Sequence, residues 1–145
     1  PEILEMIPIN KKVSIEREIY PKIAGNRLYG FPFEGYFIDA GTPESYLEAN
    51  FKTLGNSGTA VHSGASIRGK CMIHESAKLE DCIVGPNTII GPDVRMEKCV
   101  VRKSVILSNV TGYGSVVEDC IIGPGSSFEK DLKRTLISPE GTITF

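Results

Sequence analysis

The sequence has no apolar run that approaches the ~20 residues needed to span a bilayer, and no secretory hydrophobic region near its start. It also lacks a strong excess of either charge, because 16 basic side chains are matched by 18 acidic ones and the formal net charge is −2. Such a surface does not attract polyanions, so we expect neither nucleic acid nor a membrane as a partner. These absences predict a cytoplasmic protein.

Metal-binding cysteine spacing is absent as well. There is no Cys-x-x-Cys pair, and cysteines at positions 71, 82, 99 and 120 match no zinc site. Three of them share an aliphatic-Glu-Asp/Lys-Cys pattern: Cys82, Cys99 and Cys120. Strands ~4.8 Å apart would bring successive thiols to near-disulfide Cα spacing, and that alternative stays open. We predict that the three thiols stack as an internal ladder of small, apolar, reduced side chains.

From about residue 61 the sequence follows a six-residue repeat. Each unit has an aliphatic residue first, often Gly or a polar residue second, and a small residue fifth. The clearest units begin at Val61, Ile73, Val84, Ile90 and Ile122. One strand and turn of this length cannot bury its own apolar face, so such units must stack on copies of themselves. The repeat therefore predicts a parallel β-helix.

A longer repeat lies over the hexads. The interval from Leu79 to Met96 fits three consecutive faces, two of six residues and one of five. The interval from Met96 to Val117 is longer by four than one such coil requires. We expect the surplus to form a loop at a coil corner between Leu107 and Thr111, where the hexad pattern is lost.

These hexads resemble those of left-handed β-helix proteins, which include acyltransferases and the C-terminal domains of sugar-nucleotide pyrophosphorylases. The resemblance implies a prism with one sheet on each face, and the first and fifth residues of each hexad pointing inward. It also implies the left hand, since connections between parallel strands are otherwise nearly always right-handed. We therefore expect a mainly β protein with a left-handed parallel β-helix of about four coils.

Residues 1–54 contain no hexads. Their patterns predict a short helix over Glu2–Ile7, a second helix capped by Ser14, and a strand or hairpin over Tyr29–Ile38. A third helix should begin after the N-cap Thr42 and stop at Gly55.

Three blocks of this segment resemble the end of the catalytic domain of sugar-1-phosphate nucleotidylyltransferases, most of all the mannose-1-phosphate guanylyltransferase branch. The blocks are Pro1–Leu4, Ser14–Ala24 and Tyr29–Asn50. The resemblance implies an α+β remnant of that domain at 1–54, a linker at 55–58, and a β-helix domain with a C-terminal cap at 59–145. Because the chain opens with Pro1 rather than Met, we expect it to be a fragment of a longer enzyme.

Within this resemblance, Asp39 matches the aspartate of an Asp-x-Gly-Thr-Pro block that helps hold the Mg²⁺ bound to the triphosphate. A hard cation with oxygen ligands offsets charge on the phosphoryl oxygens. Glu34 and Gly35 match the sugar side of the pocket. The parent enzyme would use a nucleoside triphosphate and a sugar-1-phosphate. The family's Gly-rich phosphate loop, its lysine and its second metal-binding aspartate are missing, so we expect this chain alone to be inactive and to hold no cofactor.

Two other functions stay open. A hexapeptide-repeat acyltransferase acting on an amino-sugar phosphate would need His62 or His74 as its general base. Both occupy the second hexad position, two hexads apart, and we expect them to face solvent on different faces. The other alternative is a stand-alone oligomerisation module. We favour assembly for 61–145, because its hexads carry no convergent polar cluster, and we expect a homo-oligomer.

The end of the chain has two further features. The charged run Glu129–Arg134 should cap the last coil, because an unblunted strand edge invites uncontrolled pairing. The segment Ile137–Ile143 should fold back as a hairpin-like tail around Pro139-Glu-Gly141.

Overall fold

The computed structural model describes residues 2–26, 28–56 and 62–145. Pro1, the Ser57-Gly58 half of the expected linker, and Val61 of the first hexad lie outside the described residues. The chain forms two compact units, Pro1–Tyr36 and Phe37–Phe145. The domain boundary expected at residue 54 rests on the family resemblance and stays a prediction. In the structure, the segment from Phe37 onward belongs to the same compact unit as the β-helix.

The first unit contains the short helix α1 (Glu2–Glu5), the π-helix η1 (Ile15–Ile19) and the helix α2 (Tyr20–Ile23). Ser14 caps η1 as predicted, since its side chain accepts a hydrogen bond from the backbone N–H of Arg17. The helical path continues through Pro21, because proline is tolerated in the first turn of α2. Ile19 and Ile23 are the buried apolar side chains of this unit.

The strand or hairpin predicted over Tyr29–Ile38 is wrong, because none of these residues lies in a strand. A strand needs a neighbour that pairs its backbone N–H and C=O groups. The described part of the chain offers no such neighbour here. The aromatic side chains of Tyr29, Phe31, Phe33 and Phe37 consequently stay exposed.

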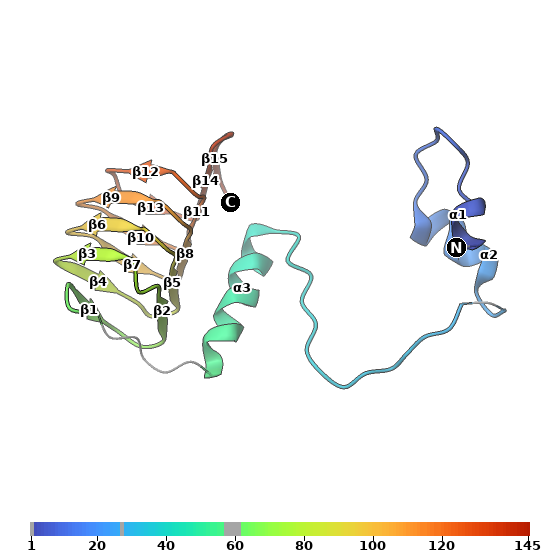
Figure 1. Ribbon diagram of the computed structural model, residues 1–145, viewed down its shortest axis with the longest axis horizontal. Coiled ribbons are helices and arrows are strands. Elements are labelled where there is room, and N and C mark those ends of the chain that lie inside the picture. Colours follow the sequence, from blue (N-terminus) through green and yellow to red (C-terminus); the bar gives the residue numbers. More distant parts are fainter. Residues whose placement is uncertain (1, 27, 57–61) are drawn as a thin grey trace. The chain divides into compact units, whose positions relative to one another are not determined.

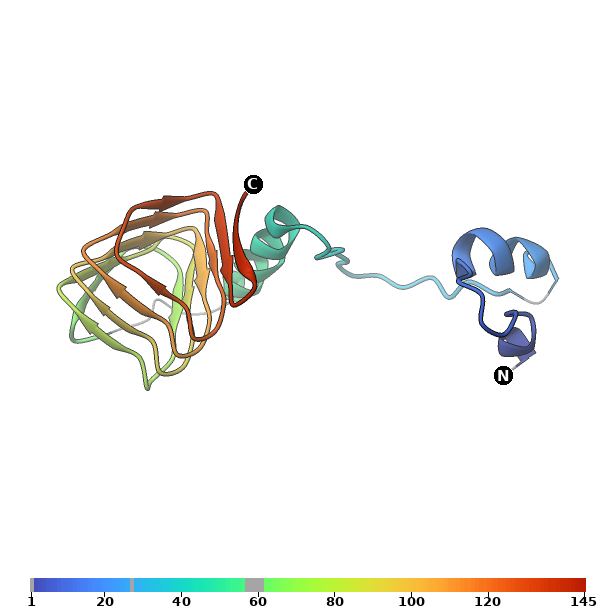
Figure 2. The same ribbon diagram turned by 90° about the horizontal axis from the view of Figure 1, so that it is seen from above.

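The second unit is a parallel β-helix with three sheets (Figures 1 and 2). Every third strand joins the same sheet, so each coil contributes one strand to each face. The first sheet contains β1 (Ala65–Ile67), β4 (Cys82–Val84), β7 (Val100–Arg102), β10 (Val116–Glu118) and β13 (Leu132–Lys133). The second contains β2 (Cys71–Ile73), β5 (Thr88–Ile90), β8 (Ser104–Ile106), β11 (Ile121–Ile122), β14 (Thr135–Ser138) and β15 (Gly141–Thr144). The third contains β3 (Lys78–Glu80), β6 (Arg95–Glu97), β9 (Thr111–Tyr113) and β12 (Ser127–Phe128).

The number of coils is about five, one more than predicted, because the first sheet holds five parallel strands. The architecture otherwise confirms the expected β-helix and is consistent with the left-handed class. Inward positions also agree with the prediction. Val84, Ile90 and Ile122 at hexad position one are at most 1% exposed, and Thr88 and Val94 at position five are fully buried.

The loop expected between Leu107 and Thr111 is wrong. Met96 pairs with Gly112, not with Val117, so the coil closes well before Val117 is reached. Val117 lies one face further along, on the first sheet, where it pairs with Val101. The long interval between Met96 and Val117 therefore comprises one complete coil and one additional face, without an insertion.

The chemistry of the corners explains why the three cysteines do not form a single ladder. At seven corners of the described chain a residue with positive φ precedes a buried Cys, Ser or Thr, whose thiol or hydroxyl donates to the carbonyl two residues before it. The left-handed residues are Asp81, Asn87, Lys98, Lys103, Gly114, Asp119 and Arg134, with φ between 46° and 58°. A left-handed residue turns the chain sharply, and the short polar side chain satisfies a carbonyl that the turn would leave unpaired.

Cys82 and Cys99 do stack on adjacent coils, because the N–H of Ile83 donates to the carbonyl of Cys99. The predicted third member is wrong. Ser115 stands next to Cys99, whereas Cys120 lies at another corner and its N–H donates to Oγ of Ser104. All four cysteines are buried and free, and their reduced state stays a prediction.

Helix α3 (Pro43–Thr53) covers the outer face of the second sheet, next to β8 (Figure 1). Its predicted start is confirmed: Thr42 and Ser45 form a reciprocal capping box, and Pro43 occupies the first turn. Leu47 is 5% exposed and packs against Val105 and Ile121. The helix ends in a 3₁₀ turn over Leu54–Asn56. α3 thus shields an apolar sheet face that would otherwise meet water.

The predicted C-terminal hairpin is confirmed, since β14 and β15 pair antiparallel. The charged run Glu129–Arg134 does not act as a separate cap. It forms part of the last coil, with Leu132 6% exposed and paired with Val117. Inward-pointing apolar residues occur even in this charged segment, because the coil period continues through it.

Gly112 offers a test of the inward packing. It is in register with Phe128, and a Cβ placed on Gly112 would overlap the ring of Phe128 at Cζ. We expect Gly112→Ala to lower the free energy of unfolding by about 1–3 kcal/mol through overpacking, as measured by urea denaturation. Phe128→Leu in the same background should recover part of the loss. If Gly112→Ala lowered the free energy of unfolding equally with and without Phe128→Leu, this packing would be contradicted.

The corner geometry predicts that Cys99→Ser changes the free energy of unfolding by less than about 1 kcal/mol, because the serine hydroxyl can donate to the Glu97 carbonyl as Ser104 and Ser115 do to theirs. In the apolar thiol ladder predicted from the sequence, the serine hydroxyl would instead lack a partner, and the cost would be about 1–3 kcal/mol. Val101→Ser on the same coil, where the side chain is fully buried among apolar neighbours, should cost at least about 2 kcal/mol. Equal urea midpoints for the two variants would refute the difference between corner and interior.

Candidate functional site

The Asp39 block forms the entrance to helix α3. Asp39 is exposed and lies in an irregular segment just before the N-cap Thr42. A Cβ placed on Gly41 would lie 3.2 Å from Oδ1 of Asp39, so glycine lets the backbone pass close to the carboxylate. The capping box then fixes the direction of α3. Asp39 is consequently presented to solvent at the start of a helix that is anchored on the β-helix.

The described residues do not assemble a metal site by themselves. Among residues 2–26, 28–56 and 62–145, no group of three or more His, Cys, Asp or Glu side chains could hold a metal ion. Mg²⁺ demands near-octahedral oxygen coordination, which Asp39 alone does not supply. The metal-binding role of Asp39 stays a prediction. The same holds for the sugar-side role of Glu34 and Gly35, which are exposed in the irregular segment before it.

Both histidines take part in local turn hydrogen bonds. His62 is half-buried, its Nε2 lies 3.0 Å from the Ala77 carbonyl oxygen, and its Nδ1 accepts from the N–H of Gly64. His74 is exposed, and its Nδ1 lies 2.9 Å from Oγ of Ser76. The two rings therefore serve separate corners and do not converge on a common point.

The buried thiols are not arranged as nucleophiles. Burial raises the pKa of Cys71 and of Cys120. The hydrogen bond between Cys82 and Cys99 lowers the pKa of the first thiol, and that bond together with burial raises the pKa of the second. Because Cys82 and Cys99 are 2% and 0% exposed, a substrate does not reach either sulfur. Their contribution is to packing at the corners.

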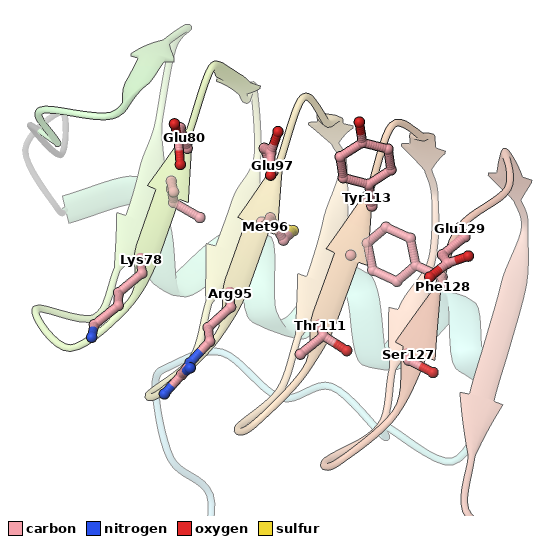
Figure 3. A pocket seen from close by; sticks show the side chains of 12 residues that line it. Lys78, Glu80, Arg95, Met96, Glu97, Thr111, Tyr113, Ser127, Phe128 and Glu129 are labelled. Atoms are coloured by element: carbon pink, nitrogen blue, oxygen red, sulfur yellow. The ribbon is translucent and has the colours of Figure 1, made fainter.

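The outer face of the third sheet carries a shallow groove of about 360 Å³ (Figure 3). Strands β3, β6 and β9 present their first and third residues outward and their middle residue inward, and Ser127, Phe128 and Glu129 continue this pattern in the last coil. One outward row contains Lys78, Arg95, Thr111 and Ser127, and the other contains Glu80, Glu97, Tyr113 and Glu129. The inward side chains Leu79, Met96 and Phe128 belong to the core. One wall of the groove thus carries two cations followed by two hydroxyl groups, and the other carries three carboxylates and one tyrosine.

The outer face of the first sheet differs in chemistry. Ile83, Val100 and Val116 stand in register and form a partly exposed aliphatic row. Beside it, Nη2 of Arg102 donates to Oε2 of Glu118 at 3.0 Å, and Nζ of Lys133 lies 3.7 Å from the same carboxylate. The Arg102 guanidinium lowers the pKa of Glu118. Charges on this face are therefore already paired within the chain.

The sequence contained a signal for the third-sheet groove that the hexad pattern obscured. Lys78-Leu-Glu80 and Arg95-Met-Glu97 share a basic-apolar-acidic order, and the interval between them is the length of one early coil. Reading that interval as strand register would have placed the two cations side by side and the two carboxylates side by side.

Comparison with known proteins gives a consistent set of matches. Residues 67–138 match the family described as GMPPB C-terminal domain. The chain is 32% identical to a probable mannose-1-phosphate guanylyltransferase 2 of Oryza sativa subsp. japonica, over 81% of this chain and 37% of that protein. It is equally similar, with the same coverage, to the mannose-1-phosphate guanylyltransferase 1 of Arabidopsis thaliana. A glucose-1-phosphate adenylyltransferase of Desulfitobacterium hafniense is 33% identical over 81% of this chain and 30% of its own length.

The chain spans little more than a third of the length of the plant relatives that it matches. The described helices include none with the length and apolar character that a bilayer-spanning segment requires.

Proposed function

Because residues 67–138 belong to the family of GMPPB C-terminal domains, we propose that this chain is the C-terminal part of a sugar-nucleotide pyrophosphorylase of the mannose-1-phosphate guanylyltransferase type. Such an enzyme joins a nucleoside triphosphate and a sugar-1-phosphate and releases pyrophosphate. The observation that carries the proposal is the similarity over 81% of the chain to mannose-1-phosphate guanylyltransferases, which extends beyond the β-helix.

The packing of α3 supports this assignment. Leu47 anchors α3 on the second sheet, Nη2 of Arg134 lies 3.3 Å from Oε1 of Glu44, and Nζ of Lys70 donates to the carbonyl of Gly55. These contacts fix both ends of the helix whose entrance carries Asp39. The β-helix is therefore a rigid support for the last segment of the catalytic domain.

The reaction class defines what this chain contributes. The oxygen of a sugar-1-phosphate attacks the α-phosphorus in line, and pyrophosphate leaves. A bound Mg²⁺ would offset the charge on the phosphoryl oxygens. The exposed carboxylate of Asp39 suits a hard cation, and it would need oxygen ligands from the rest of the enzyme. GTP and mannose-1-phosphate are the proposed substrates, with Glu34 and Gly35 on the sugar side.

We also infer an assembly role for the β-helix and a cytoplasmic location. A solenoid of stacked coils presents flat, repetitive faces that suit alignment of subunits. Four free, buried thiols fit a reducing compartment. Neither histidine is placed for base catalysis, so the acyltransferase alternative has no observation in its favour.

The isolated 145-residue chain should release no pyrophosphate from GTP in the presence of mannose-1-phosphate and Mg²⁺, because the phosphate-binding loop of the family is missing from it. A coupled pyrophosphate assay measures this directly. Turnover by the purified chain above a no-protein control would overturn the assignment as an incomplete catalytic unit.

In the full-length enzyme, Asp39→Ala should reduce kcat by at least about 100-fold, since a lost ligand weakens stabilisation of the transferring phosphoryl group. The urea midpoint should stay unchanged, because Asp39 is exposed. Glu75→Ala, which removes an exposed carboxylate from a β-helix corner, is the matched control and should leave kcat unchanged. Equal kcat for the two variants would remove Asp39 from the active site.

A further inference from the structure

The outer face of the third sheet places like charges in register. Lys78 pairs with Arg95, and Glu80 pairs with Glu97, on the neighbouring parallel strands β3 and β6. Side chains that stand directly opposite one another on adjacent strands are close neighbours, and like charges in such positions destabilise a sheet. Repulsion within each row therefore destabilises the sheet, and the core of the β-helix does not require these outward charges.

These charges are largely unpaired within the described part of the chain. No ion pair or hydrogen bond involves the side chains of Lys78, Arg95 or Glu80 there, and all three are exposed. Glu97 is the exception, because Nζ of Lys98 lies 2.8 Å from its Oε1. This contrasts with the first sheet, where Arg102 and Lys133 both lie against the carboxylate of Glu118. A partner surface that placed acidic side chains opposite the basic row, and basic side chains opposite the acidic row, would offset this repulsion.

A second copy of the same face meets that requirement. A two-fold axis parallel to the coil axis keeps each coil level with its counterpart and exchanges the two rows. Lys78 then faces Glu80 of the other copy, and Arg95 faces Glu97, each pair occurring twice. In the next coils, the hydroxyl of Thr111 faces that of Tyr113, and Ser127 faces Glu129. A two-fold axis along the strands would oppose each row to itself with the coil order reversed, and it would form none of these ion pairs.

We propose that the third-sheet face is a homodimer interface in which two copies associate about an axis parallel to the coil axis, through reciprocal Lys78–Glu80 and Arg95–Glu97 ion pairs. The proposal rests on the assembly role inferred above and is independent of nucleotidyl transfer. Sheets that pack face to face lie ~10 Å apart, a gap that long charged side chains from both copies can fill.

The size of the face determines the expected strength. Four strands spaced by ~4.8 Å and about three residues long present a face of only a few hundred Å², below the ~800 Å² per partner of a standard interface. The dimer should therefore be weak in this chain and depend on concentration. Its ion pairs lie at a solvent-accessible surface, so salt should dissociate it.

Sedimentation equilibrium of the 145-residue chain tests the proposal. At about 0.02 M salt the average mass should rise with concentration from 15.8 kDa toward twice that value, and at about 1 M salt it should stay at 15.8 kDa. The double variants Lys78→Glu/Arg95→Glu and Glu80→Lys/Glu97→Lys should each remain monomeric at low salt. An equimolar mixture of the two should form a 1:1 dimer, because β3 and β6 then carry only acidic outward charges in one variant and only basic ones in the other.

Lys11→Glu/Lys12→Glu is the matched control, since it makes the same change in net charge as Lys78→Glu/Arg95→Glu at exposed positions outside the β-helix. It should associate as the unchanged chain does. The quadruple variant that exchanges both rows should regain the homodimer, which keeps the test valid if one double variant fails to fold. Association that persists in both double variants would overturn this interface and leave assembly through another face. A chain that stays monomeric at low salt and high concentration would overturn the assembly role as well.

Discussion

Each coil of this β-helix can pair its backbone only with the coils on either side of it, and the rest of the structure depends on that one-dimensional pairing. Strands of two to four residues bury too little surface to exist alone, so register between coils must be kept even where the sequence changes. Coils become shorter along the chain, as the interval from Ala65 to its partner Cys82 exceeds that from Val117 to its partner Leu132. Register survives because each shortening occurs at a corner and not within a strand.

The corners tolerate changes in coil length because the same hydrogen-bond arrangement recurs at seven of them in the described chain. A left-handed residue turns the chain sharply, and a buried Cys, Ser or Thr satisfies the carbonyl that the turn exposes. Thiol and hydroxyl are interchangeable there because both are small donors, which explains why Cys99 stacks on Ser115 in place of another cysteine. The corners can therefore vary in sequence while the prism interior remains apolar.

The three faces differ in what they can contact because their outward rows differ. The second sheet presents aliphatic side chains and is covered by α3. The first pairs its own charges across strands. The third leaves two like-charged rows largely without counterions from the described part of the chain. In the proposed parent enzyme, one face would hold the segment that contains α3 and another would be available to a second subunit.

The β-helix, the start of α3 and the C-terminal hairpin could be predicted from the sequence, because they depend on hexad periodicity, on the Thr42-Pro43 cap and on a turn at Pro139-Glu-Gly141. The sequence did not determine which coil residues stand side by side. The interval between Met96 and Val117 reads equally as a coil with a loop or as a coil and one further face, and only the pairing of Met96 with Gly112 decides between them. The irregular path of Tyr29–Ile38 was likewise decided by tertiary structure, since a strand-forming sequence remains unpaired without a neighbouring strand. Asp39 was predicted from its motif, whereas the charged rows of the third sheet are recognised only once the register between coils is known.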